Sequence, residues 1–410
     1  MKRRPLPIAM LGLVMACGTS KSDLPLEDAA SALDAVAVDT QVPDTLPAIA
    51  TCIAEYTGNT NRPLLTDSSA ACFTAKNYLA QAGTLGALVR DDWDPTAGLD
   101  DASAFSPTFT VAADGSGTHT TVQAAIDAAH ASASATRVYI LIQPGTYREL
   151  VCVKGTVPIT LYGANVDASL VTIVFNNYNG KPVDTANVNA CAVPTGATYG
   201  TSGSSTFFAT SDGFQAMNLT LANDLDELAL GTTSNIQAVA ATVQGDKSVF
   251  HNVRFLGNQD TLQVKSATGT TVARSYYKNC YLEGDTDYVF GRGTAVFDGC
   301  TLVYVSARKT NSTFLSPSTE QANGFGYLIV NSKMVGDAKM TTNTAYLGRS
   351  WDDSSASKPN GQAVIRETEI GAAIRVAIPW AAAATSSRLF DPATNRLYEY
   401  QNTGAGAATP

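Results

Sequence analysis

Four segments of the chain place acidic, amide or basic side chains at the ends of apolar runs that have the composition of β-strands. The segments are NIQAVA with Gln237, GNQDTL with Gln259 and Asp260, GDTDYVFG with Asp287, and YLGRSW with Arg349 and Trp351. A carboxylate is ionised at neutral pH and can attack an ester carbonyl without a base to activate it. If the fold brings the four segments together, these residue types suffice for ester hydrolysis.

Each residue type has a separate task in such a reaction. The amide groups of Gln237 and Gln259 can donate hydrogen bonds to the oxyanion that forms on the carbonyl oxygen, and one preorganised donor is worth about 3 kcal/mol. A second carboxyl group must protonate the leaving alkoxide, which requires a pKa raised by burial and by a nearby like charge. Arg349 can hold the attacking carboxylate in its ionised form through a bidentate pair.

The apolar run after Asp287 fits the same hypothesis. Val289 is expected to point into the core, whereas Tyr288 and Phe290 are candidates to lower the local dielectric or to form the floor of a sugar site. Trp351 is a candidate to stack on a pyranose ring. Asp285, two residues before Asp287, is interpreted as a turn residue.

The strand-like segments predict the fold. From about residue 105, short runs rich in Val, Ile, Thr, Phe and Tyr recur between Gly, Asn and Asp. Four runs share an asparagine two residues after an apolar side chain, at Asn218, Asn252, Asn279 and Asn331. Asparagine tolerates the left-handed conformation of a tight turn, and stacked asparagines can pair between coils. Irregular coils that share one turn predict a parallel β-helix, with a β-sandwich as the alternative. Two-residue hairpin turns are few, which disfavours the sandwich.

One helix is expected near the start of this region. Thr120-Thr121-Val122-Gln123 fits a capping box, in which Gln123 reaches back to Thr120. Val122, Ile126 and Ala129 then lie on one face. Such a helix can cover the open end of a β-helix, where backbone groups would otherwise be unpaired.

The composition and the absence of certain motifs disfavour several classes of function. The chain has 410 residues, 45% of them hydrophobic, and a formal charge of −9 without a basic stripe, so no nucleic acid partner is expected. No metal is expected, because the three histidines share no ligand spacing. The acidic cluster Asp224, Asp226 and Glu227 is interpreted as an exposed loop rather than a calcium site. The absence of a G-x-S-x-G motif disfavours an α/β-hydrolase route to ester cleavage.

The N-terminus, MKRRPLPIAMLGLVMACGTS, has a basic start and an apolar stretch too short to span a bilayer. It is similar to a lipoprotein signal, in which residues 1–16 are removed and Cys17 is lipidated; an ordinary signal peptide is the alternative. Gly18 favours an outer-membrane anchor, at the cell surface or the periplasmic face.

Residues 17–50 are interpreted as a flexible tether, residues 51–104 as an extension that packs on the main domain, and residues 105–410 as the catalytic domain.

Six further cysteines, an even number in an exported protein, indicate disulfides. They are Cys52, Cys72, Cys152, Cys191, Cys280 and Cys300. The residues alone do not choose among the possible pairings.

The ordered set of motifs resembles that of the pectinesterases (pectin methylesterases, carbohydrate esterase family 8). The resemblance runs from about Val111 to Ala407. It comprises VAADGSGTHTTVQAAIDAA, PGTYREL, YGTSGSST, LTLAND, QAVA, GNQDTL, GDTDYVFG, YLGRSW and LYEYQNTGAGA. It implies an all-β, right-handed single-stranded parallel β-helix, a monomer that acts on pectin or methylated oligogalacturonides, and no cofactor.

The resemblance also implies a role for individual residues. Asp287 would be the nucleophile, Asp260 the general acid and then base, and Gln259 a stabiliser of the transition state. The residues implied to bind substrate are Gln237, Thr201, Arg349, Trp351 and Phe290. A disulfide brackets the nucleophile segment in bacterial members of the family, which implies a Cys280–Cys300 bond.

Three positions depart from the usual motifs: Asn258, Thr286 and Ser350. They leave open a second hypothesis, a lipoprotein hydrolase of the same fold that acts on another ester or a thioester. A third hypothesis is a surface carbohydrate-binding β-helix without turnover. The family's further substrate-binding arginine is aligned with Arg308, with a slip of one residue.

The ordered set of motifs predicts hydrolysis of galacturonate methyl esters in pectin to methanol and demethylated pectin.

Overall fold

The computed structural model describes residues 51–97, 101–231, 233–352 and 359–408. Contacts divide the chain into two compact units, Met1–Leu46 and Pro47–Pro410. The expected signal peptide, the lipidated Cys17 and the tether all lie outside the described residues. Within the described ranges, no helix is both long and apolar enough to cross a membrane.

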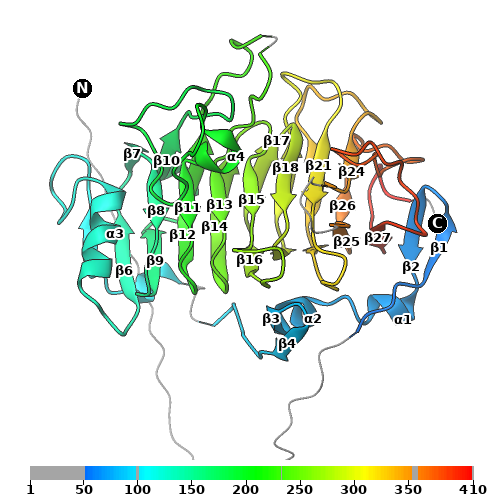
Figure 1. Ribbon diagram of the computed structural model, residues 1–410, viewed down its shortest axis with the longest axis horizontal. Helices are drawn as coiled ribbons and strands as arrows, with labels where there is room; N and C mark the ends of the chain where they lie inside the picture. Colours follow the sequence, from blue (N-terminus) through cyan, green and yellow to red (C-terminus); the bar gives the residue numbers. More distant parts are fainter. Residues whose placement is uncertain (1–50, 98–100, 232, 353–358, 409–410) are drawn as a thin grey trace, which may run out of the picture. The chain divides into compact units, whose positions relative to one another are not determined.

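Most of the second unit is a stack of coils, whose strands pair in parallel with strands of the neighbouring coils (Figure 1). Two hairpins of the N-terminal extension are antiparallel. One sheet contains seven strands. In chain order they are β8 (Val151–Val153), β11 (Phe207–Ala209), β13 (Ala241–Val243), β15 (Leu262–Val264), β18 (Thr286–Gly291), β21 (Thr313–Pro317) and β24 (Tyr346–Gly348). The predicted parallel β-helix is therefore confirmed.

A second, eighteen-stranded sheet contains two rows of strands that run along the other sides of the coils. The first row is β5 (Phe109–Val111), β6 (Val138–Ile142), β9 (Ile159–Gly163), β12 (Gln215–Asn223), β14 (Ser248–Leu256), β16 (Arg274–Lys278), β19 (Thr294–Asp298), β22 (Tyr327–Val330), β25 (Gln362–Arg366) and β27 (Arg396–Tyr400). The second row is β7 (Gly145–Arg148), β10 (Val171–Phe175), the ends of β12 and β14, β17 (Tyr281–Gly284), β20 (Thr301–Tyr304), β23 (Lys333–Gly336) and β26 (Glu369–Ile370).

The chain bends from the first row to the second at the predicted asparagines. Asn218, Asn252, Asn279 and Asn331 have φ angles of 56°, 52°, 53° and 52°, in the left-handed region that asparagine tolerates better than most residues. The Nδ2 atom of Asn252 donates to Oδ1 of Asn218 at 2.8 Å, and Nδ2 of Asn218 donates to the Gly163 carbonyl at 3.2 Å. The expected pairing of stacked asparagines between coils is thus confirmed for one pair.

Buried side chains from successive coils fill the interior of the β-helix. Phe250, Tyr277 and Phe297 stack nearly parallel, with ring centroids 5.1 and 4.5 Å apart. All three belong to β14, β16 and β19, which are register neighbours in the first row. The aromatic column therefore follows directly from the parallel register, and it stabilises that register by burial and by ring contacts.

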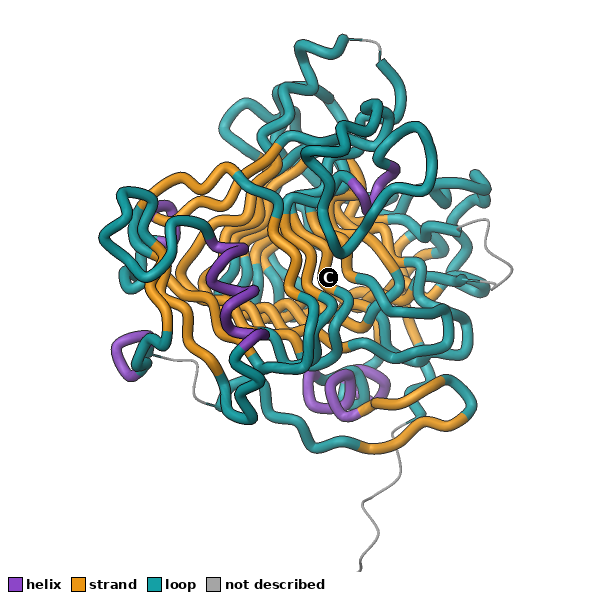
Figure 2. Tube along the Cα trace, turned by 60° about the vertical axis from the view of Figure 1, so that its left-hand side comes forward, coloured by secondary structure: helices purple, strands orange, loops and turns teal. Residues whose placement is uncertain are grey.

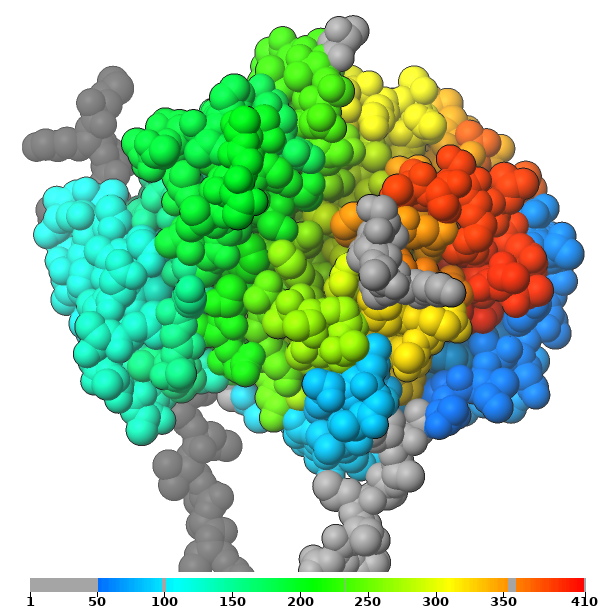
Figure 3. Space-filling view, in the orientation of Figure 1, coloured from blue at the N-terminus to red at the C-terminus, as the bar shows by residue number. Residues whose placement is uncertain are grey.

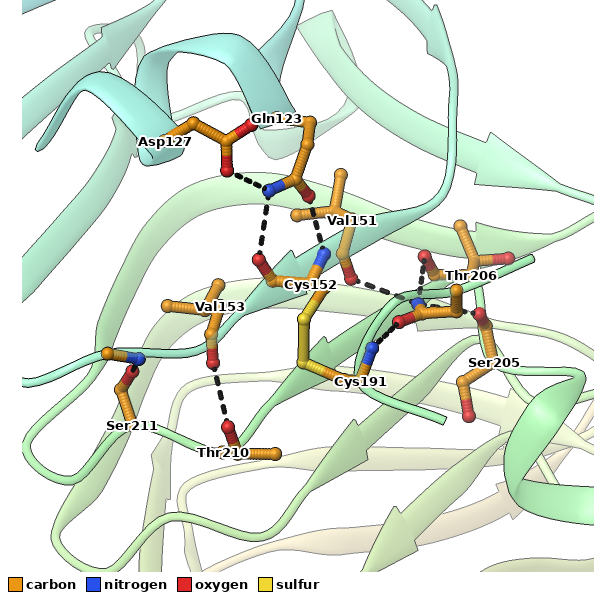
Figure 4. Close-up of a disulfide and its surroundings, with 12 residues drawn as sticks. Gln123, Asp127, Val151, Cys152, Val153, Cys191, Ser205, Thr206, Thr210 and Ser211 are labelled. Carbon is orange, nitrogen blue, oxygen red and sulfur yellow. Dashed lines mark hydrogen bonds between the residues drawn. A yellow bond between two sulfur atoms is a disulfide. The ribbon is translucent and has the colours of Figure 1, made fainter. Parts of the chain in front are cut away.

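The helix α3 (Val122–Ala131) covers the open end of the first coils, as Figure 2 shows. Its face of Val122, Ile126 and Ala129 is fully buried, as predicted. The capping box was placed one residue too early. Thr121 caps the helix by accepting from Ala124 N, and Gln123 instead bonds both backbone groups of Cys152 in β8 (Figure 4). Gln123 is engaged there because β8 is the first strand of its sheet, with unpaired backbone groups on its outer side.

Four cysteines form two disulfides, Cys52–Cys72 and Cys152–Cys191, the second of which is drawn in Figure 4. The expected Cys280–Cys300 bond is wrong, because both thiols are free and buried. The two cysteines occupy equivalent places on neighbouring coils, since Tyr281 pairs with Thr301. Each thiol turns toward a backbone carbonyl of the preceding coil, Cys280 toward Phe250 at 3.4 Å and Cys300 toward Tyr277 at 3.3 Å.

The N-terminal extension lies against the first row of the larger sheet. It contains β1 (Tyr56–Asn59), β2 (Arg62–Leu65), α1 (Asp67–Ala70), α2 (Ala75–Ala80), β3 (Gln81–Thr84), β4 (Ala87–Arg90) and a 3₁₀ turn, Ala102–Ala104. Phe73, Tyr78 and Leu79 are buried in one cluster with sheet residues such as Phe325 and Tyr398. Strand β2 also pairs with β27, so blue N-terminal and red C-terminal residues lie side by side in Figure 3. Two short elements complete the described helices: a 3₁₀ turn, Ala168–Leu170, and α4 (Gly200–Gly203).

The asparagine turn predicts a stability effect. We expect Asn252→Ala to lower the free energy of unfolding by about 2 kcal/mol. About half would come from an alanine held at positive φ and about half from the lost hydrogen bonds to Asn218 and Val166. Urea unfolding measures the change. Asn252→Gly is the matched control: it loses the same hydrogen bonds but adopts the turn freely, so a glycine variant less stable than the alanine variant would contradict the backbone contribution.

Candidate active site

The four segments that carry acidic, amide or basic side chains at strand ends meet at one pocket of about 250 Å³ on the outer side of the seven-stranded sheet. All eight predicted catalytic and substrate-binding residues line it: Thr201, Gln237, Gln259, Asp260, Asp287, Phe290, Arg349 and Trp351. Ser316, Ala384 and Thr385 complete the wall. The residues come from successive coils, which is why a span of about 150 residues of sequence contributes to one small pocket.

Direct backbone pairing between coils sets the spacing within the pocket. Ala238 N donates to the Gln259 carbonyl at 3.1 Å, and Asp260 N donates to the Thr286 carbonyl at 3.1 Å. Each bond joins a residue of the pocket, or its direct neighbour, to the next coil. Gln237, Gln259 and Asp287 are therefore held one coil apart along the sheet, at the separation of hydrogen-bonded strands, about 4.8 Å.

A bulge in β18 aims Asp287 at the pocket. Thr286 pairs with Thr313 and Val289 with Leu315, so two residues of β18 oppose one residue of β21. Asp287 has a φ of 47°, an uncommon value that its short polar side chain tolerates. The bulge turns Tyr288 inward, where it is fully buried, so its expected place at a sugar site is wrong. Phe290 lies outside and contacts Trp351, with ring centroids 5.8 Å apart.

Arg349 forms a bidentate ion pair with Asp287. Its Nε and Nη2 atoms donate to the two carboxylate oxygens at 2.9 and 2.6 Å. Both side chains are only partly exposed, 26% for Arg349 and 12% for Asp287, so water screens the pair weakly. The pair fixes the plane of the carboxylate relative to the pocket.

Asp260 lies in a different electrostatic environment. Burial raises its pKa well above the usual range, and the negative charges of Asp287 and Glu227 raise it further. The cations Arg349 and Lys309 oppose this effect without cancelling it. The pocket therefore contains one carboxylate paired with an arginine and one buried carboxyl group with a raised pKa, which is the contrast that acid catalysis requires.

A second layer behind the pocket was missed by sequence reasoning. Asp285 is fully buried, and Glu227 is 2% exposed. Arg308 pairs with both, through Nη2 to Asp285 at 2.6 Å and through Nε to Glu227 at 2.8 Å. Asp285 lies at the bend between β17 and β18, as a turn residue would, but its burial and its pair with Arg308 were not expected. The interpretation of Glu227 as part of an exposed loop is wrong. Arg308, aligned above with a substrate-binding arginine, does not line the pocket.

Glu227 links this second layer to the catalytic pocket. Its Oε1 atom accepts from Gln259 N at 3.2 Å and so fixes the loop that presents Gln259 and Asp260. Burial raises the pKa of Glu227 to about 7, against the opposing effect of Arg308. No sequence signal marks Glu227, because it belongs to a loop outside the repeating strands.

Asn179 orients two residues of the pocket and was also missed. Its Nδ2 atom donates to Thr201 Oγ1 and to Gln237 Oε1, each at 3.1 Å. Because the Gln237 oxygen is engaged, the amide nitrogen of Gln237 is left as the donor toward the pocket. Asn179 lies in a long loop without a period, which explains why the sequence did not reveal it.

The departure at Ser350 has a structural role. Ser350 is buried and donates to Asp352 Oδ1 at 2.8 Å, and Asp352 is held by a bidentate pair with Arg388. Ala384 N bonds the Ser350 carbonyl at 2.9 Å, so this network fixes the segment whose Ala384 and Thr385 form one wall of the pocket. Among the described residues, no group of three or more His, Cys, Asp or Glu side chains is arranged to hold a metal ion.

The fold is a parallel β-helix, and its pocket brings together the side chains of two aspartates, two glutamines and one arginine. Residues 108–410 match the family described as Pectinesterase. The chain is 43% identical to a pectinesterase of Ralstonia nicotianae, over 87% of this chain and 94% of that protein. It is 31% identical to a putative acyl-CoA thioester hydrolase of Escherichia coli, YbhC, over 85% of this chain and 90% of that protein. The crystal structure of YbhC covers 88% of this chain and all of its own, with a TM-score of 0.75.

A pectin methylesterase mutant solved in complex with a hexasaccharide is 26% identical, covering 75% of this chain and 92% of its own, with a TM-score of 0.63. The chain belongs to the pectinesterase family and is a carboxylic ester hydrolase.

The raised pKa of Glu227 predicts how stability depends on pH. An unfolded glutamate loses its proton near pH 4.5, whereas folded Glu227 keeps it until about pH 7. Between these values the folded state binds more protons, so stability falls as the pH rises and then levels off. We expect urea unfolding from pH 4 to 8.5 to show wild type losing stability relative to Glu227→Gln over that window. Glu369→Gln, at an exposed ion pair, is the control; a constant difference between wild type and Glu227→Gln would contradict the prediction.

Proposed function

We propose that the protein hydrolyses methyl esters of galacturonate in pectin, with Asp287 as nucleophile and Asp260 as general acid and then base. The observation that carries the proposal is the contrast between the two carboxyl groups of one pocket: Asp287 is paired with Arg349, and Asp260 is buried with a raised pKa. The similarity to pectin methylesterases, one of them solved with a hexasaccharide, supports the choice of substrate.

The first half of the reaction uses the two aspartates and the two glutamines of the pocket. A carboxylate oxygen of Asp287 attacks the ester carbonyl carbon, and the carbonyl oxygen becomes an oxyanion that accepts from the amides of Gln259 and Gln237. As the C–O bond to the methoxy group breaks, Asp260 gives its proton to the departing oxygen and methanol leaves. The products at this stage are methanol and an acyl-enzyme anhydride between galacturonate and Asp287.

The second half restores the enzyme. Asp260 is now ionised and takes a proton from a water molecule, which attacks the galacturonyl carbon of the anhydride. The bond to Asp287 breaks, Asp287 returns to its ionised state beside Arg349, and Asp260 is protonated again. Phe290 and Trp351 supply an aromatic surface for the sugar rings on either side of the ester.

The nucleophile assignment is testable with one matched pair of variants. Asp287→Asn should lower methanol release from methylated pectin by at least about a thousandfold, because an amide does not attack an ester, while the fold is kept. Asp224→Asn breaks another bidentate arginine pair, which is about half exposed at the surface, and should leave methanol release unchanged. Retained turnover in Asp287→Asn would contradict the assignment.

The relative in Escherichia coli supports a second candidate, an esterase of the same mechanism that acts on another ester or a thioester. Thr286 is one departure that bears on it, because its hydroxyl bonds Asp285 and accepts from Lys309 beneath the pocket. Turnover of a generic ester or an acyl thioester without methanol release from pectin would favour this candidate. Binding of pectin without any hydrolysis would favour a non-catalytic β-helix.

We also propose that Cys17 carries a lipid that anchors the enzyme to the outer membrane, a proposal supported by the signal-like sequence before it. Radiolabelled palmitate should label wild type but not Cys17→Ala, and density-gradient fractionation should find wild type in the outer membrane. Gly18→Asp is the control, since an aspartate after the lipidated cysteine is associated with inner-membrane retention. An unlabelled wild-type protein would contradict the anchor.

A further inference from the structure

Lys309 is a third cation near the reacting acids, besides Arg349 and Arg308. It lies in the loop that follows β20, where its backbone carbonyl accepts a hydrogen bond from the hydroxyl of the fully buried Tyr304. Its Nζ atom donates to the hydroxyl of Thr286. Arg349 and Arg308 bond carboxylates directly, whereas Lys309 bonds a neutral hydroxyl group. The positive charge of Lys309 therefore acts on several acids rather than on one partner.

Thr286 places this ammonium group among the acids of the site. Asp285 and Asp287 flank Thr286 in the chain, and the Thr286 hydroxyl donates to Asp285 Oδ1 at 2.9 Å. The Thr286 carbonyl accepts from Asp260 N, on the neighbouring coil, at 3.1 Å. The residue that contacts Lys309 thus joins the two coils that carry three of the acids.

The charges around Lys309 and the charge of Lys309 itself affect one another. Burial and the positive charge of Arg308 lower the pKa of Lys309. Three carboxylates oppose this effect: Asp285, Asp287 and Glu227. In return, the charge of Lys309 lowers the pKa of Asp260 and the pKa of Glu227, against the burial that raises both.

The site contains more acids than cations. The acids are Asp260 and Asp287 in the pocket and Asp285 and Glu227 behind it, and the cations are Arg349, Arg308 and Lys309. If all the acids were ionised, one negative charge would be unbalanced in a site that water screens weakly. One proton on one acid removes that charge, and Asp260 is the acid without a guanidinium partner among the described residues.

The proposed reaction keeps the same balance of charge in both of its halves. It begins with a proton on Asp260 and with Asp287 ionised. In the acyl-enzyme, Asp287 is acylated and uncharged, and Asp260 is ionised because its proton has left with methanol. Each state therefore has as many carboxylates as cations, provided that Lys309 is present. Without Lys309, ionised Asp260 would add to a negative charge that nothing in the site balances.

We propose that Lys309 is a positioning residue that limits the four acids of the site to one proton and so makes Asp260 an effective acid. The inference rests on the proposed function, because it concerns the acid of that reaction. Lys309 does not line the pocket, so it acts through its charge and not through contact with the substrate. Its removal should make Asp260 a weaker acid, which gives up its proton to the methoxy group less readily.

The titration of the acids tests this charge effect without any turnover. Carbon-13 labels on the carboxyl groups of aspartate and glutamate report each titration by NMR, and Asp260→Asn and Glu227→Gln assign the two signals. We expect the Glu227 pKa of about 7 to rise by about one unit in Lys309→Met, and the Asp260 pKa to rise as well, because each loses a nearby positive charge. An unchanged titration of either group would overturn the inference.

Kinetics then connect the charge to the reaction. The high-pH limb of kcat/KM for methanol release reports ionisation of the acid in the free enzyme. In Lys309→Met this limb should move to higher pH, because Asp260 keeps its proton longer. At pH 7 the same variant should show a kcat lower by about threefold to tenfold, because a weaker acid transfers its proton more slowly. Loss of packing alone would lower kcat and leave the limb in place.

Two further variants separate charge from shape. Lys309→Arg keeps the positive charge and should bring the limb and kcat back toward wild type, whereas Lys333→Met, from an exposed ion pair, should change neither. A Lys309→Arg enzyme with the properties of Lys309→Met would overturn the inference, since the charge would then have no effect. Absence of methanol release from wild type would instead contradict the proposed reaction, and the NMR titration would still decide whether Lys309 controls the acids.

Discussion

The parallel register of the seven-stranded sheet is the constraint on which the site depends. Hydrogen bonds between coils hold neighbouring strands about 4.8 Å apart, so residues separated by a whole coil in sequence become direct neighbours in space. Asp260 and Asp287 belong to adjacent coils, and Arg349 follows a strand two coils further along. A slip of one residue in any of these strands would turn its pocket side chains into the core, as the contrast between Val289 in the core and Phe290 in the pocket shows. The apolar interior therefore fixes the catalytic geometry indirectly, by fixing the register.

Within that geometry, the positions of the cations give the acidic side chains of the site different electrostatic environments. Four acidic side chains lie in or behind the pocket. Arg349 forms an ion pair with Asp287, and Arg308 forms ion pairs with Asp285 and Glu227. No guanidinium among the described residues pairs with Asp260. Burial and the negative charges of Asp287 and Glu227 raise its pKa, so the second layer affects the acid without lining the pocket. Glu227 connects the two layers physically, through its bond to the backbone of Gln259.

The sequence predicted the coils, which repeat along the chain, and the pocket residues that lie in short motifs. Asn218, Asn252, Asn279 and Asn331 revealed the coils because a left-handed turn restricts the residue type at each one. The eight pocket residues were predicted from motifs at strand ends. Asn179 and Glu227 were not, since they lie in irregular loops whose positions are set by packing against other coils. The thiols of Cys280 and Cys300 show another limit: the family resemblance implied a bond between them, but the direction of each side chain decides whether a bond forms.

The formal charge of the protein and the charge of a demethylated pectin chain have the same sign. The formal charge of −9 repels a demethylated, polyanionic chain over the whole surface, which favours release of product segments that leave the groove. Surface repulsion is screened by salt, whereas a partly buried ion pair such as that of Arg349 and Asp287 is screened much less.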